Sequence, residues 1–162
     1  MPTRLATGEP PTVTDAQLAA DLADLGYLGF AHLKRKRPSR KNPADVLLSA
    51  LNAPQREARA VEALPWLLLA YPDMKWKEVT RLAKMLDLQN RLGFLVNVAG
   101  GMAEKKNDRP LANLLRSREA DLERSMLARE DTLCNENMTR AERRWLADHR
   151  PGTDREVRVS LP

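Results

Sequence analysis

The sequence predicts an all-α protein, a compact bundle of six or seven helices with a helix-turn-helix-like corner, a flexible N-terminus and a C-terminal tail. Leucine and alanine supply most of the apolar residues, while aromatic residues make up only 4% and isoleucine is absent. Apolar residues recur at helical spacing, and capping residues stand before several of these runs. The predicted organisation is a lead-in over residues 1–13, one helical domain over 14–148, and a tail over 149–162.

The first two helices carry clear start signals. Thr14 is an N-cap residue, and Gln17 stands at the position that completes a capping box. Gly26 is expected to end this helix. The segment "NPADVLLSALN" begins the second helix, with Asn42 as the N-cap and Pro43 in the first turn.

The middle of the chain holds the predicted core. A third helix is expected over residues 54–69, with Pro65 either kinking it or beginning a new helix. The segment "PWLLLAY" is apolar on all sides and is predicted to lie at the centre of the core. Asp73 is expected to cap the next helix, over residues 75–86.

Three further segments follow this helix. A fifth helix is predicted over residues 91–99, ended by Gly100 and Gly101. Residues 103–109 are polar and predict a loop. The run of leucines that follows predicts a long helix over residues 110–133.

The last helix signal is "TRAERRWL", in which Thr139 and Glu142 form a second capping-box pattern. Trp145 and Leu146 are the residues expected to dock this helix on the core. The segment "EVRVSL" alternates, which predicts either one edge strand or a tail that binds a partner.

The basic excess of the chain lies in one segment, "KRKRPSRK", which we call the basic arm (residues 34–41). It carries six cations and no acid, whereas the rest of the chain has 21 basic and 22 acidic residues. Such a segment attracts phosphate groups or an acidic protein surface. The predicted nucleic-acid ligands are Lys34, Arg35, Lys36, Arg37, Arg40 and Lys41. The alternatives are an acidic protein partner or a solvated loop.

The segment "RLAKMLDLQNRLGFLV" predicts two packed helices joined by a tight corner. A helix-turn-helix of this kind would expose Gln89, Asn90, Arg91 and Asn97, and these residue types bond base edges. Asp87 stands where glycine is commonest, and Gly93 falls where a branched apolar anchor is expected. The alternative is a plain helical corner whose polar residues face water.

The twelve-residue segment "NRLGFLVNVAGG" resembles a "RLGYLLE-LG" type of segment in bacterial antitoxins of the abortive-infection AbiE type. Those proteins pair a winged-helix DNA-binding portion with a helical portion, repress their own operon and oppose a nucleotidyltransferase toxin. The resemblance therefore implies an antitoxin-like transcriptional repressor. It assigns no individual functional residue.

Signals for an enzyme, a metal site or a cofactor are missing from the sequence. His32, His149 and Cys134 are isolated, and no phosphate-binding glycine loop or nucleophile elbow is present. A Cys–His pair formed only in the folded chain is the one enzymatic route left open. The single cysteine, the lack of a secretory signal and the lack of a run of about 18 apolar residues predict a cytoplasmic protein.

The sequence therefore favours a non-enzymatic nucleic-acid-binding regulator, with DNA preferred over RNA, no metal, no cofactor and no membrane partner. The alternative is a helical protein–protein interaction module, an adaptor or a toxin-neutralising partner. In that case residues 110–133 and the tail after Pro151 would make the contact. Either hypothesis is compatible with a homodimer.

Overall fold

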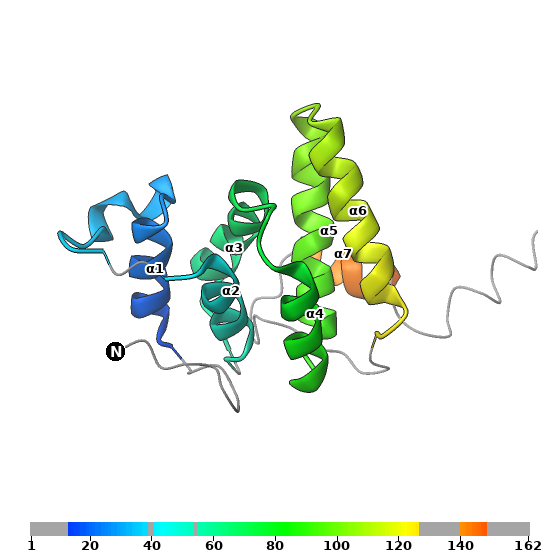
Figure 1. Cartoon of the computed structure of the whole chain (residues 1–162), viewed down its shortest axis with the longest axis horizontal. Coiled ribbons are helices and arrows are strands. Elements are labelled where there is room, and N and C mark those ends of the chain that lie inside the picture. Colours follow the sequence, from blue (N-terminus) through cyan, green and yellow to red (C-terminus); the bar gives the residue numbers. More distant parts are fainter. Residues whose placement is uncertain (1–12, 39–40, 54, 127–139, 149–162) are drawn as a thin grey trace, which may run out of the picture.

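The computed structural model describes residues 13–38, 41–53, 55–126 and 140–148, and all regular secondary structure in this part of the chain is helical. Figure 1 shows α1 at one end, α2 and α3 in the middle, and α4 to α7 at the other end. The predicted all-α class is thus confirmed. The elements are α1 (Asp15–Asp24), η1 (Leu28–Leu33), α2 (Pro43–Leu51), α3 (Ala58–Ala70), α4 (Trp76–Met85), α5 (Gln89–Lys105), α6 (Arg109–Glu123) and α7 (Arg140–Asp148).

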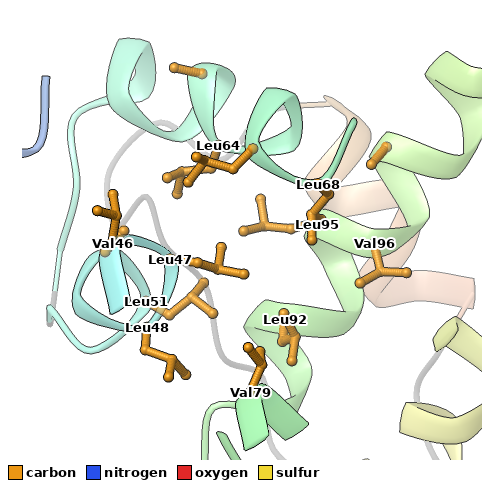
Figure 2. Close-up of a cluster of buried hydrophobic side chains, with 14 of the residues drawn as sticks. Val46, Leu47, Leu48, Leu51, Leu64, Leu68, Val79, Leu92, Leu95 and Val96 are labelled. Atoms are coloured by element: carbon orange, nitrogen blue, oxygen red, sulfur yellow. The ribbon is translucent and has the colours of Figure 1, made fainter. Parts of the chain in front are cut away.

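Helix α5 is the central element, since it contacts α3, α4, α6 and α7. The core forms where α2, α3 and α5 meet, and Figure 2 shows their leucine side chains pointing toward one another. Fully buried members of this cluster include Leu47, Leu64, Leu68, Leu92 and Leu95. The prediction that "PWLLLAY" lies in the core is confirmed for Leu67 and Leu68, which are fully buried. Trp66 and Leu69 are only partly buried.

Helix starts follow the predicted caps at two of three places. Thr14 Oγ1 accepts a hydrogen bond from Gln17 N at 3.1 Å, and Thr14 N donates to Gln17 Oε1 at 3.0 Å, which completes the capping box. Asn42 Oδ1 accepts from Ala44 N at 3.0 Å. The prediction for Asp73 was wrong: α4 has Lys75 at its N-cap, without a side-chain cap bond.

Helix α3 begins at Ala58, later than predicted, and continues through Pro65 to Ala70. Pro65 therefore does not begin a new helix. A proline removes one N–H donor from the helix interior. The surrounding burial compensates, because Pro65 is buried together with Leu64 before it and Leu67 two residues after it.

The predicted end of α5 was wrong, because the helix runs through Gly100 and Gly101 to Lys105. An added Cβ at Gly100 would lie 3.2 Å from Cζ of Arg116 on α6. The glycine thus makes room for a side chain of the neighbouring helix rather than breaking its own. The helix ends instead near Asn107, which has a left-handed φ of 58°.

Helix α6 ends at Glu123, whereas a helix to residue 133 was predicted. Residues 127–139, including Thr139 and Cys134, lie outside the described residues, as does the tail after Pro151. The α7 start signal is therefore not described. Of the two residues expected to dock α7, Trp145 is buried. Its ring packs edge-on against the ring of Phe94, with 6.1 Å between the ring centroids.

Gly93 explains how α7 reaches the core. An added Cβ at this position would lie 2.5 Å from Cε of Met126 and 3.0 Å from Cζ2 of Trp145. The absence of a side chain at Gly93 therefore accommodates the indole ring. Glycine stands at position 93, where a branched apolar residue was expected, because α7 packs against this position.

Replacing Gly93 with valine is expected to lower the free energy of unfolding by about 1–3 kcal/mol, because the added methyl groups overpack the Trp145 site. Urea unfolding of the full chain measures the loss. The control is Gly101→Ala on the same helix, where the nearest atom is 4.0 Å from the added Cβ. That change should raise stability by up to about 1 kcal/mol. Equal stability of Gly93→Val and wild type would contradict this account of α7 docking.

Candidate nucleic-acid interface

The basic arm is fastened to α1 at two points. Arg35 Nη1 contacts Asp21 Oδ1 at 2.8 Å and Asp24 Oδ2 at 2.9 Å, and Arg35 N donates to Asp24 Oδ1 at 2.9 Å. Lys41 Nζ contacts Asp21 Oδ2 at 2.8 Å. Arg35 and Lys41 therefore hold the described residues of the arm, 34–38 and 41, beside α1.

These contacts divide the predicted ligands of the arm into two groups. Arg35 and Lys41 are structural, since they neutralise two aspartates whose side chains are only 3% exposed. Lys34, Lys36 and Arg37 are exposed and form no ion pair with another described residue. Arg40 lies outside the described residues.

The electrostatics of the fastened end favour the charged form of Arg35. Its hydrogen bond to Asp21 is the main cause that raises the pKa of this guanidinium above its ordinary value, with Asp24 adding to it against a cost of burial. Arg35 therefore stays charged, and Asp21 and Asp24 neutralise its charge. The net positive field of the described loop comes from Lys34, Lys36 and Arg37.

Sequence reasoning missed Asp21 and Asp24. The spacing of these two residues in the sequence could have indicated their role, because acids three residues apart share one side of a helix and can face a common cation. Which cation they face depends on the path of the chain after Gly26. That glycine turns the backbone with a φ of 112°, a value that suits glycine.

The corner between α4 and α5 is tight, as predicted. Asp87 adopts a left-handed φ of 56°, the conformation for which glycine was expected. Leu88 N then donates to Ala83 O at 2.8 Å, and the Leu88 side chain is buried. Two packed helices joined by a short turn are thus confirmed.

Of the four expected base-reading residues, Asn97 is half-buried and donates from Nδ2 to Glu119 Oε1 at 2.7 Å, and two others are not on the surface. Gln89 is 6% exposed and Asn90 is 3% exposed. Gln89 Nε2 donates to the carbonyl of Ser125 at 3.2 Å, so it ties the corner to the end of α6. The expectation that these residues are exposed was wrong, because the first turn of α5 packs into the interior.

Arg91 is half-buried and serves the C-terminus of α2. Its Nη1 donates to Leu51 O at 2.7 Å and to Ala53 O at 2.5 Å. These carbonyls belong to the last turn of α2 and the residues after it, where a cation also meets the negative end of the helix dipole. Arg91 is therefore a capping residue in this fold.

The described residues contain no group of three or more His, Cys, Asp and Glu side chains that could hold a metal ion. His32 is exposed, while His149 and Cys134 lie outside the described residues. Within the described chain, no helix is long and apolar enough to cross a bilayer.

No protein-family model, curated protein or solved structure matches this chain. The functional argument therefore rests on the chain's own residues. Among the predicted site residues, the structure brings Lys34, Lys36 and Arg37 together as exposed cations in the segment after η1. It does not bring Gln89, Asn90 and Arg91 to that segment or to the surface as a group.

Proposed function

We propose that this protein is a non-enzymatic nucleic-acid-binding protein that contacts the phosphate backbone through Lys34, Lys36 and Arg37. The observation that supports this most is the exposure of three cations within four residues, none of them paired with another described residue, on a segment held by α1. A held segment keeps these cations together without help from the ligand. Ordering costs on binding are correspondingly small.

Phosphate contact and base reading are separate tasks in nucleic-acid recognition. The arm supplies cations for the first task. The corner does not supply readers for the second, since Gln89 and Asn90 are buried and Arg91 caps α2. The proposal is therefore backbone binding with little sequence preference through these elements. The antitoxin-like repressor role would require base-reading residues elsewhere in the chain.

The alternative of a protein–protein interaction module placed the contact on residues 110–133 and the tail. Helix α6 ends at Glu123, and residues 127–133 and the tail lie outside the described residues. No described contact favours this alternative over the exposed basic arm.

The test is the salt dependence of binding to a fluorescent 24-base-pair DNA duplex, followed by anisotropy between 50 and 200 mM salt, a range over which three phosphate contacts change affinity by about 40-fold. The variant carries Lys34→Glu, Lys36→Glu and Arg37→Glu. Loss of three phosphate contacts should reduce the slope of log K against log salt by about 2.7. Affinity at the lowest salt should fall by about 10²-fold or more.

The matched control reverses three cations at the turn between α5 and α6, namely Lys105, Lys106 and Arg109. These are also exposed, but Glu104 and Asp108 stand among them. The overall charge change is the same, so only the location differs. We expect the control to keep the wild-type slope. Absence of wild-type binding at 50 mM salt, or equal losses in both variants, would contradict the proposed function.

A further inference from the structure

Helix α4 carries a second basic surface that faces away from the core. Lys77, Arg81 and Lys84 are separated by four and three residues, so they fall within an arc of about 60° along one side of the helix. All three are exposed, and none forms an ion pair with another described residue. We call these three residues the α4 stripe.

The opposite side of α4 fixes the direction of the stripe. Val79, Leu82 and Ala83 are buried, and the helix contacts both α2 and α5. Because the apolar side is held by two neighbours, the stripe must point outward. Thr80 adds no free hydroxyl to it, since Thr80 Oγ1 donates to Trp76 O at 2.8 Å.

The acids of this region lie beside the stripe rather than within it. Glu78 is turned by about 100° from Lys77 and by about 60° from Arg81 around the helix. Its charge adds to burial in raising the pKa of Asp45 on α2, so Glu78 lies on the side of α4 that faces α2. Asp87 lies in the turn after α4. The stripe itself contains three cations and no acid.

Of the two helices that meet at the corner, α4 therefore has one side exposed to solvent, whereas α5 is surrounded by α3, α4, α6 and α7. We propose that the α4 stripe is a second phosphate-contact surface for the same nucleic-acid ligand. This inference rests on the proposed function of the basic arm. The three cations span about 10 Å of helix, which matches about three phosphates along one strand at about 3.4 Å of duplex axis per phosphate.

A polymer is the ligand that suits two separated basic surfaces. Figure 1 shows α2 and α3 between the arm beside α1 and helix α4. A small anion would occupy either surface alone. A 24-base-pair duplex is about 80 Å long, whereas a domain of this size is about 40 Å across, so the duplex is long enough to span the distance between the two surfaces.

The test compares four proteins on that duplex: wild type, the arm variant, a stripe variant with Lys77→Glu, Arg81→Glu and Lys84→Glu, and the two sets combined. The stripe variant should reduce the salt slope by about 2.7, as the arm variant does, and the combined variant by about twice that amount. The reversal at Lys105, Lys106 and Arg109 remains the control. If the stripe variant unfolds, as circular dichroism would show, the corresponding glutamine variant replaces it.

The outcomes separate the two proposals. If the arm variant loses affinity and the stripe variant binds like wild type, the stripe is only a solvated helix face and the inference is overturned, while the proposed function stands. If wild type does not bind the duplex, both fail. If the stripe alone matters, the proposed role of the arm fails and α4 is the contact.

Discussion

Replacing Arg56 with alanine is expected to lower the free energy of unfolding by about 3 kcal/mol, one of the two largest effects of a single substitution that we predict for this chain. The Arg56 side chain is only 2% exposed. Its guanidinium joins the end of α2 to the start of α1. Removing it leaves both of these parts with unpaired acceptors.

The contacts of Arg56 explain the size of this effect. Nε donates to Ala50 O at 3.0 Å and Nη2 donates to Ser49 O at 3.0 Å, so Arg56 caps the last turn of α2. Nη1 donates to Val13 O at 2.6 Å and to Asp15 Oδ1 at 3.1 Å, at the start of α1. Asp15 is partly exposed, so most of the loss comes from the orphaned carbonyls rather than from the ion pair.

Urea unfolding of the Arg56→Ala variant measures the loss, with Arg81→Ala as the control. Arg81 is exposed on α4, so its removal should change stability by about 0.5 kcal/mol or less. Arg56→Lys should keep only part of the free energy of unfolding that Arg56→Ala loses, because an ammonium group lacks the planar guanidinium that reaches several carbonyls at once. Equal losses for Arg56→Ala and Arg81→Ala would refute the capping role.

Replacing Leu95 with alanine is expected to cost about 2–5 kcal/mol. Leu95 lies on α5, is fully buried, and faces the leucines of α2 and α3 (Figure 2). Truncation removes its burial and leaves a cavity where three helices meet, so the neighbouring side chains cannot close the gap without moving their helices.

The matched control is Leu114→Ala on α6, the same chemical change at a side chain that is 39% exposed. It should cost about 1 kcal/mol or less, since little burial is lost and water fills the space. Both variants are compared by urea unfolding, and the dependence of the free energy of unfolding on urea concentration should be the same for both. A loss at Leu114 that matches the loss at Leu95 would show that the core is not centred where α2, α3 and α5 meet.

The sequence by itself determined the features that depend on neighbouring residues. The all-α class follows from helical spacing of leucine and alanine, and the starts of α1 and α2 follow from Thr14, Gln17 and Asn42, because capping is a local hydrogen-bond pattern. The tight corner before Gln89 was also predicted correctly. Only the residue that turns it, Asp87, was unexpected in type.

The tertiary structure decided the features that depend on residues far apart in the chain. Glycine inside a helix costs about 1 kcal/mol, and packing against Arg116 of α6 outweighs this at Gly100, so α5 continues where an end was predicted. The polar residues of the corner were expected at the surface. Ser125 and the end of α2 lie opposite them in the fold, and those partners allow polar side chains to be buried.

The basic arm shows both contributions in one segment. Its charge is a property of the sequence, and so is its capacity to attract phosphate. Which cations remain available was decided by α1, where Asp21 and Asp24 hold Arg35 and Lys41 and leave Lys34, Lys36 and Arg37 exposed. The physical reason is that an ion pair requires two groups within about 4 Å, and only the folded path of the chain brings residues 21 and 41 together.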